Sequence, residues 1–422
     1  MSGGVEVLLG LLILAYLGSV LVAGRTIRGF GLPSGAEYLV LGVVLGPHLL
    51  GVVQRSTVKD FEPLLGAAAA WLAFVAGLGF SIVGERRVRL RGAVLGVVSA
   101  SFVAGLVGGA LFFALGALDA LSPAERLPAA LGAGAVSCES TRQAVRWIVE
   151  RHGARGPVSD AMADIARTSA LVPVLVLGAM FAMASDAPLE RLAAPARLCV
   201  GAALGLSLGV MAAVLLGREF RRDESWGLLL GTTLLAAGVT TRLGLSAMTT
   251  LFVMGLTLSF VSRHRFEIKL MVEPTEKPVM LPVVLFAGAY VDFDAVAWLP
   301  ALVAVALAAR VAAELVRGVA FTKLVQGAKG AGPLIGLGLA STGSISLAVA
   351  FSAFIRLPGA ASSLVLAIAA ASLVFGEMVA PALLRRALER AGETRAVAPV
   401  EPSPLSSPRA APPRAEGTGP AP

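Results

Sequence analysis

The sequence predicts an all-α polytopic membrane protein with about 13 transmembrane helices. Of the 422 residues, 56% are apolar and only 15% are charged, whereas about a quarter of residues are charged in a soluble globular protein. The mean hydropathy is +0.82. Aromatic residues make up only 6% of the chain, and there are 48 glycines. This composition suits closely packed helices, because small residues let membrane helices approach one another.

The expected helices follow from the length needed to cross a bilayer, about 20 mostly apolar residues. Thirteen segments meet it, at 5–23, 35–54, 63–83, 92–118, 127–149, 158–184, 194–217, 226–241, 244–262, 278–292, 296–321, 332–355 and 360–384. The first has a long apolar run with no basic region before it, which favours a retained helix over a signal peptide.

Basic residues between the segments predict the orientation, because Lys and Arg concentrate in cytoplasmic loops. The odd-numbered loops carry 18 of them and the even-numbered loops seven. We therefore expect the N-terminus outside and the C-terminus in the cytoplasm, in a bacterial inner (plasma) membrane. The net charge of +8 is explained by these loops, so nucleic-acid binding is not expected.

Two parts of the chain are expected. Residues 1–390 form the membrane domain, and residues 393–422, rich in Pro, Ala and Ser, form a disordered cytoplasmic tail. Cys138 and Cys199 both lie in apolar segments, which argues against a disulfide scaffold. The three histidines lack ligand spacing, so neither a metal nor another cofactor is expected.

Polar residues interrupt the fifth and twelfth segments near mid-membrane. The fifth contains SCESTRQ, with Glu139, Ser140, Thr141 and Arg142, and the twelfth contains STGSIS, which begins at Ser341. Ser and Thr in membrane helices often only bond a neighbouring carbonyl. A carboxylate and a guanidinium at this depth, however, each cost at least about 2.5 kcal/mol unless paired or hydrated. Two interrupted segments in corresponding halves are typical of a transporter built from inverted repeats.

Several further stretches resemble the monovalent cation:proton antiporters, in the order that family has them. They are LPSGAEYLVLGVVLGPHLLGVV, WLAFVAGLGFSI, RHGARGPVSDAMADIARTSALVPVLVLG, EPTEKPVMLPVVLFAGAYVDF and FGEMVAPALLRRALERAGE. The resemblance covers most of residues 5–390. It implies an inverted-repeat core in which the fifth and twelfth helices are broken and cross. It also implies a second domain that usually forms a homodimer, transport by alternating access, and a monovalent cation and protons as substrates.

The chain departs from the family at the ion-binding position of the sixth segment. Where the family commonly has a pair of Asp, this chain has Ser169 and Ala170. Asp160 and Asp164 precede this position, but Asp164 points about 140° away from Ser169 on a helix. Asp160, Asp164 and Arg167 instead share one stripe, which is either an internally paired surface or an entrance funnel.

The eleventh segment carries AARVAAELV, where the family has a basic residue near the crossing. Arg310 matches that residue type, although Glu314 one turn later is the other candidate. The two are an i, i+4 pair able to neutralise each other, so a structural lock and a role in transport both stay open.

Glu139 is the carboxylate that depth places best for an ion site, beside Ser140 and Thr141. The candidate transport residues are Glu139, Ser140, Thr141, Ser169, Arg310, Glu314, Thr342, Gly343 and Ser344, with Arg142, Asp160, Asp164 and Arg167 as secondary candidates. The competing interpretation is that Glu139 only pairs with Arg142, three residues on.

The sequence thus favours a secondary transporter that exchanges Na⁺ or K⁺ for protons. One alternative is an anion carrier on the same fold, which Arg142 and Arg310 would suit. The other is a degenerate relative that senses or supports without transporting, because the Asp pair is missing. No nucleophile elbow, Walker loop or paired catalytic carboxylates are present, which argues against an enzyme.

Overall fold

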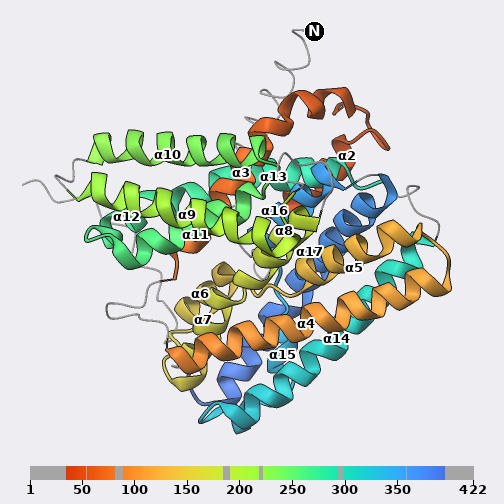
Figure 1. Cartoon of the computed structure of the whole chain (residues 1–422). Helices are drawn as coiled ribbons and strands as arrows, with labels where there is room; N and C mark the ends of the chain where they lie inside the picture. Colours follow the sequence, from red (N-terminus) through yellow and green to blue (C-terminus); the bar gives the residue numbers. More distant parts are fainter. Residues whose placement is uncertain are drawn as a thin grey trace, which may run out of the picture.

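The computed structural model describes residues 35–53, 55–80, 89–183, 191–217, 222–292, 298–357 and 359–394. Every regular element in these residues is a helix (Figure 1). The predicted first span, 5–23, lies outside the described residues, as does all but the start of the predicted tail 393–422.

Each of the other twelve predicted spans coincides with one or more helices. Those of the first half are α2 (Ala36–Leu45), α3 (Arg55–Leu78), α4 (Leu90–Ala117), α5 (Pro123–Ser137), α6 (Arg142–Arg151), α7 (Pro157–Thr168) and α8 (Leu171–Met183). Those of the second half are α9 (Ala194–Leu216), α10 (Arg222–Arg242), α11 (Ala247–Val261), α13 (Glu276–Ala289), α14 (Leu299–Leu324), α15 (Ile335–Gly338), α16 (Ser344–Arg356) and α17 (Gly359–Arg390).

Some of the predicted limits were wrong. The second span was expected to continue to residue 54, but α2 ends at Leu45, because the next residue, Gly46, precedes a proline and is disfavoured in the helical region. Another helix, α12 (Arg265–Val272), followed by the short turn η1 (Glu273–Thr275), was not predicted. Charged residues alternate with apolar ones along α12, so a hydropathy criterion does not detect it.

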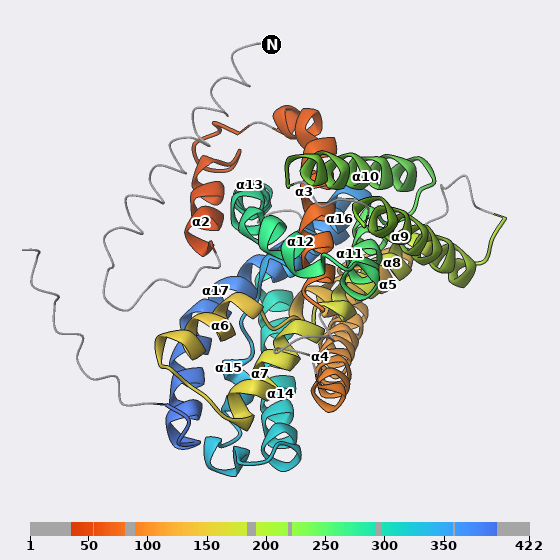
Figure 2. The same ribbon diagram turned by 90° about the vertical axis from the view of Figure 1, so that its left-hand side faces the viewer.

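The helices form two groups in both views of the ribbon (Figures 1 and 2). One contains α3 and α9 to α12, around a core cluster that includes Phe74, Met254 and Ile268. The other contains α4, α6, α7, α14, α15 and α17, all of which except α4 share a buried cluster that includes Ile148, Ile165 and Leu384. A larger cluster joins both groups through α5, α8, α13 and α16. We call the first group, with α13, which packs on α3, the scaffold group, and the second group, with α5, α8 and α16, the core group.

The core group repeats one pattern of helices. A long helix, α4, precedes the broken pair α5 and α6, and a long helix, α14, precedes the broken pair α15 and α16. The pair α7 and α8 follows in the first half and α17 follows in the second. This order is the inverted-repeat arrangement with two broken helices that the sequence predicts.

Helix surfaces fit a bilayer setting. Six helical stretches of the described chain are long and apolar enough to cross a membrane: 61–78, 90–117, 157–183, 194–216, 299–324 and 359–390. Large apolar side chains are exposed on the outer helices, for example Phe113 on α4, Val214 on α9 and Leu234 on α10. Inside, Gly77 and Gly255 let α3 and α11 touch, since a Cβ on either glycine would overlap a backbone carbonyl oxygen of the other helix.

Candidate functional site at the crossing of two broken helices

Two non-helical stretches face each other in the middle of the core group. Residues 138–141 separate α5 from α6, and residues 339–343 separate α15 from α16. The Thr141 N–H donates to the Ser341 carbonyl at 2.9 Å, and the Ser140 hydroxyl donates to the Leu339 carbonyl at 2.6 Å. The predicted breaks near 137–142 and 341–344 are therefore confirmed, and they bond directly to each other.

Serine, threonine and glycine explain why the helices break here. Hydroxyl side chains offer the backbone local hydrogen bonds that compete with the helix. Gly343 is needed for close approach, because a Cβ there would lie 2.6 Å from Thr141 Oγ1 and 2.9 Å from Glu139 Oε1. Only a glycine fits between the two stretches without displacing one of them.

Glu139 lies in the first break and is buried, with 4% of its surface exposed. Its Oε2 accepts a hydrogen bond from the Ser346 N–H at 2.7 Å. Ser346 is in the first turn of α16, where N–H groups lack partners within the helix and the helix dipole favours negative charge. Glu139 therefore places its carboxyl group at the amino end of the second broken helix.

This contact corrects the interpretation in which Glu139 only pairs with Arg142. The ion pair of Arg142 is with Glu276, at 3.4 Å between Nη2 and Oε2. Glu276 is the first residue of α13, is buried, and also accepts from the Ser344 hydroxyl at 3.3 Å. Reasoning within one helix could not find this partner, since the two residues are 134 positions apart.

Ser169 is fully buried and lies at the crossing, between α7 and α8. Its Oγ accepts from the Ser140 N–H at 3.1 Å and can donate to the Ser140 carbonyl at 3.3 Å. Ala170, beside it, is also buried. The position at which the family commonly has an acid thus contacts the residue next to Glu139, and here it supplies a hydroxyl.

Arg310 is fully buried and reaches the second break from α14. Its Nη1 donates to Thr342 Oγ1 at 2.8 Å and its Nη2 donates to the Ala340 carbonyl at 2.7 Å. The Arg310 guanidinium therefore contacts one carbonyl and one hydroxyl that follow α15, while the Glu139 carboxyl group accepts from the N–H end of α16. Each charge has the sign that the adjoining half-helix end favours.

Glu314 does not pair with Arg310, so the structural lock, one of the two interpretations left open by the sequence, is not formed. Its ion-pair partner is Arg317, three residues on, at 2.5 Å between Nη2 and Oε2, and both side chains are buried. Arg310 instead extends to the break, because the oxygen atoms of Ala340 and Thr342 are within reach of its guanidinium. Of the two candidates, it is therefore Arg310 that lies near the crossing.

The acidic stripe on α7 faces α4 and not the crossing. Asp160 pairs with Arg89 at 3.2 Å, and Asp164 lies 3.9 Å from Arg167 and accepts from the Arg89 N–H at 3.3 Å. Of the two interpretations of the stripe, internal pairing therefore holds only for Asp164 and Arg167, since Asp160 pairs with a residue at the start of α4. The structure does not bring Asp160 or Asp164 together with Glu139.

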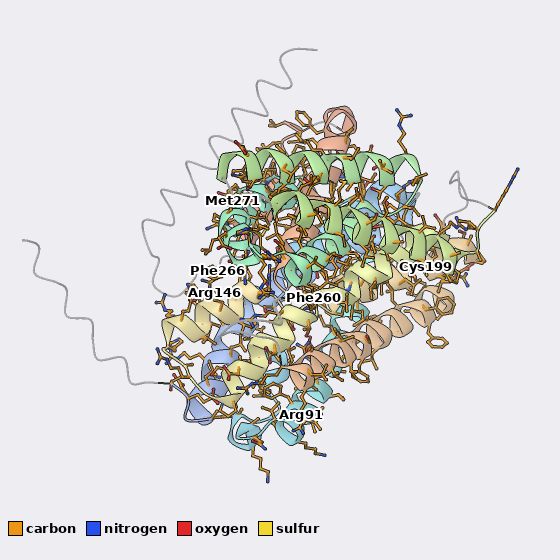
Figure 3. All side chains as sticks on the ribbon, turned by 60° about the vertical axis from the view of Figure 1, so that its left-hand side comes forward. Arg91, Arg146, Cys199, Phe260, Phe266 and Met271 are labelled. Carbon is orange, nitrogen blue, oxygen red and sulfur yellow. The ribbon has the colours of Figure 1, made fainter. Side chains whose placement is uncertain are left out.

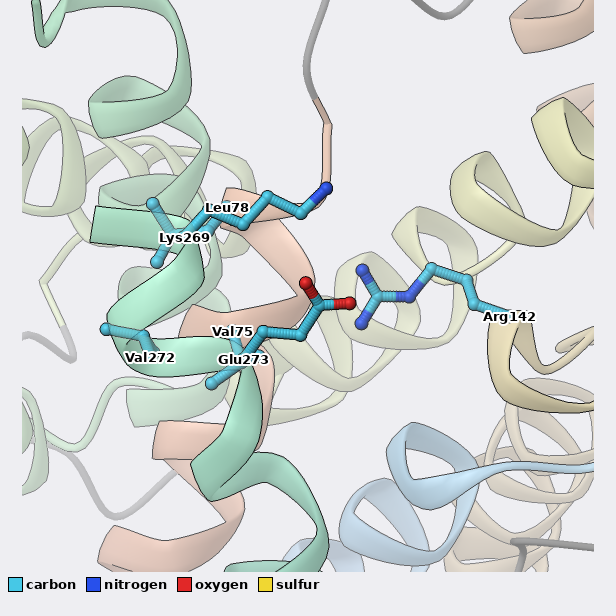
Figure 4. Close-up of a pocket in the computed structure, with 6 residues that line it drawn as sticks. All are labelled: Val75, Leu78, Arg142, Lys269, Val272 and Glu273. Carbon is cyan, nitrogen blue, oxygen red and sulfur yellow. The ribbon is translucent and has the colours of Figure 1, made fainter. Parts of the chain in front are cut away.

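A pocket beside the crossing contains, besides Arg142, the charged residues Lys269 and Glu273, which were not singled out in the sequence. The pocket is small and is lined by Val75, Leu78, Arg142, Lys269, Val272 and Glu273. Figure 4 shows Arg142 on one side, with Lys269 and Glu273 extending from the other. Their signal in the sequence, charged residues between the ninth and tenth spans, is the same as that of an ordinary loop.

The architecture and the crossing define a class, that of membrane transporters built on two crossed broken helices. The match to a family is direct: the model of the sodium/hydrogen exchanger family, described as transmembrane, matches residues 12–385. The chain belongs to the sodium/hydrogen exchanger family, a transporter family and not an enzyme family, and is an integral membrane protein.

Solved structures of similar fold include two of one protein, the sodium proton antiporter MjNhaP1 from Methanocaldococcus jannaschii. The structure at pH 8 has a TM-score of 0.69 and 16% sequence identity, with 93% of this chain and 99% of that chain covered. An electron-microscopy map gives 0.63 and 15%, covering 92% and 98%. At this identity the likeness establishes the fold. No curated relative matches the sequence.

Proposed function

We propose that the chain exchanges Na⁺ or K⁺ for protons by alternating access, and that Glu139 binds the proton and the cation in turn. The observation that carries the proposal is the position of this buried carboxylate at the crossing, on the amino end of α16. Membership of the family supports the exchange of a cation for protons.

The chemistry needs a negative charge at this depth. A partly dehydrated cation loses many kcal/mol of hydration energy, and hydroxyls alone replace only part of it. Ser169 has no charge to offer, so the charge must come from a nearby group that can also lose and regain a proton. Glu139 satisfies both conditions, because a carboxylate that holds a proton has lost most of its attraction for a cation.

Oxygen ligands for the cation are available beside Glu139. The Ser169 hydroxyl contacts the Ser140 backbone, the Ser140 hydroxyl donates to the Leu339 carbonyl, and Thr141 Oγ1 lies close to Gly343. We assign to Arg310, Thr342, Gly343 and Ser344 the role of holding the second break in place. Glu314 is assigned to the Arg317 pair, and Asp160, Asp164 and Arg167 to the contact with α4.

The anion carrier is supported less well by this geometry. Arg310 donates to Thr342 and to a backbone carbonyl, and Arg142 pairs with Glu276. An anion would have to replace these partners to bind either guanidinium. The hypothesis of a degenerate relative that does not transport is supported only by the absence of the Asp pair.

The proposed setting follows the loop charges and the family resemblance. Residues 1–390 would form the membrane domain of a homodimer in a bacterial inner (plasma) membrane, with residues 393–422 as a cytoplasmic tail. The N-terminus would lie outside, as the excess of basic residues in odd-numbered loops predicts.

The test is proton movement in proteoliposomes that contain a pH-sensitive dye. A pulse of Na⁺ or K⁺ should move protons through the parent protein, and Glu139→Gln should abolish the movement while folded protein remains in the membrane. Glu150→Gln is the matched control, because Glu150 is exposed on α6 and belongs only to a surface pair with Arg146.

Three outcomes separate the hypotheses. Proton movement triggered by a cation and lost in Glu139→Gln supports the proposal. Movement triggered only by an anion supports the carrier. The absence of movement with every ion tested supports the degenerate relative.

A further inference from the structure

Two ion pairs connect α6 to the corner between α12 and α13. Arg142 pairs with Glu276 at 3.4 Å, and Arg146, one helical turn later, pairs with Glu273 at 3.0 Å. The two arginines are four residues apart on α6, and the two glutamates are three residues apart across η1 and α13. These four charged residues, two on α6, one on η1 and one on α13, thus form two ion pairs in a row, which we call a ladder of two rungs.

The ladder joins the two groups of helices. Ile148 of α6 packs in the cluster that includes α7, α15 and α17, whereas Ile268 of α12 packs in the cluster that includes α3 and α9 to α11. A relative movement of the core group against the scaffold group must therefore stretch both rungs.

Exposure increases along the ladder, away from Glu139. The inner rung is the more buried, with 22% of the Arg142 side chain and 11% of the Glu276 side chain exposed. In the outer rung the values are 58% for Arg146 and 37% for Glu273. Arg142 is the first residue of α6, directly after the break that contains Glu139. The rungs therefore lie in series between the surface and the crossing.

The residues around Arg142, the arginine of the inner rung, leave room for its side chain. A Cβ at Gly79, just after α3, would overlap Arg142 Nη1, so the glycine leaves room for the guanidinium. Lys269 lies on the other side of the pocket (Figure 4). Burial lowers the pKa of its amine, while the Glu273 carboxylate raises it. Glu273 is thus within the influence of two cationic side chains from different helices.

We propose that Arg142, Arg146, Glu273 and Glu276 form an ion-pair gate. The gate closes the route to Glu139 at the end where α6 faces η1 and α13. The inference rests on the proposed function for its purpose, since the gate would prevent ions from reaching the crossing from both sides at once. The gate itself is a property of the two helix groups and can be measured without transport.

Cys138 provides the measurement, because it is buried beside Glu139 in the first break. Cys199, the other free cysteine, lies on the surface far from Arg146 (Figure 3). In a Cys199→Ser background, Cys138 becomes the single thiol. Its rate of reaction with a small cationic methanethiosulfonate in detergent then reports how often the crossing opens to water.

We expect the single variants Glu273→Gln and Arg146→Glu to raise the labelling rate of Cys138 about two- to fivefold, as befits a partly exposed pair. Glu276→Gln and Gly79→Ala act on the more buried inner rung and should raise it about tenfold. The charge swap Arg146→Glu with Glu273→Arg should return the rate to within about twofold of the background. Glu150→Gln, which removes a partner of Arg146 on α6 itself, should leave the rate unchanged.

Equal labelling rates in the background and in all four single variants would overturn the gate, as would a swap that labels as fast as either single change. Gly79→Ala keeps every charge, so it tests the inner rung even where Glu276→Gln does not fold. Altered labelling with a parent protein that moves no ions would leave the gate standing and reject the proposed function. Normal cation-driven proton flux with unaltered labelling would support the proposed function and reject the gate.

Discussion

Gly343→Ala is the substitution that tests most sharply how the two breaks fit together. The new Cβ would lie 2.6 Å from Thr141 Oγ1, 2.8 Å from Thr141 Cβ and 2.9 Å from Glu139 Oε1. Ordinary contacts of this kind are at least about 3.5 Å, so the atoms must separate by more than half an ångström. Neither neighbour moves freely, because the Thr141 N–H is bonded to Ser341 and the Glu139 carboxylate to Ser346.

The cost of such overpacking is about 1–3 kcal/mol, which is a factor of roughly 5 to 150 in the population of the native crossing. We expect Gly343→Ala to lower the apparent melting temperature of the detergent-solubilised protein and to reduce cation-driven proton flux by at least about fivefold. Gly105→Ala is the control, because Gly105 is exposed on α4 and no atom lies within 4 Å of its added Cβ. Equal stability and flux in the two variants would refute the close approach of the breaks at Gly343.

Three more substitutions test other parts of the account. Glu314→Gln should destabilise the protein by about 3–5 kcal/mol, because it leaves the buried Arg317 without its counter-charge. Thermal unfolding measures this loss, with Glu389→Gln, which alters an exposed ion pair, as the control. Equal stability of the two variants would contradict the prediction. Glu393→Ala should cost about 1 kcal/mol, because the Glu393 carboxylate accepts from the N–H groups of Val158 and Ser159 at the start of α7; an unchanged melting temperature would show that this cap contributes nothing. Asp164→Asn should weaken proton flux without abolishing it, since Asp164 contacts α4 and not the crossing; complete loss of flux in folded protein would place Asp164 in the ion route.

The membrane segments and the two breaks could be predicted because their signals are local. A run of about 20 apolar residues identifies a span, and a cluster of Ser, Thr and Gly within it identifies a break. The resemblance to the family added the position of Ser169, which the structure places against Ser140. Helix α12 was missed, since its alternating charges make it look like a loop.

The partners of the charged residues could not be predicted from the sequence. Spacing along a helix offered Arg142 for Glu139 and Glu314 for Arg310, both three or four residues away. The structure instead pairs Glu139 with an N–H of α16, and Arg310 with a carbonyl and a hydroxyl of the second break. Glu276 was not singled out at all, because its partners Arg142 and Ser344 lie on other elements. Such contacts depend on tertiary approach, which the spacing of residues in one helix does not contain.

The most direct test of the central claim is the release of protons when a cation binds to the purified protein in weakly buffered detergent. If Glu139 binds the proton and the cation in turn, adding Na⁺ or K⁺ below the pH at which Glu139 is fully ionised releases up to about one proton per chain. Glu139→Gln should release none, while Glu150→Gln behaves like the parent protein. Proton release from Glu139→Gln equal to that of the parent would contradict the account.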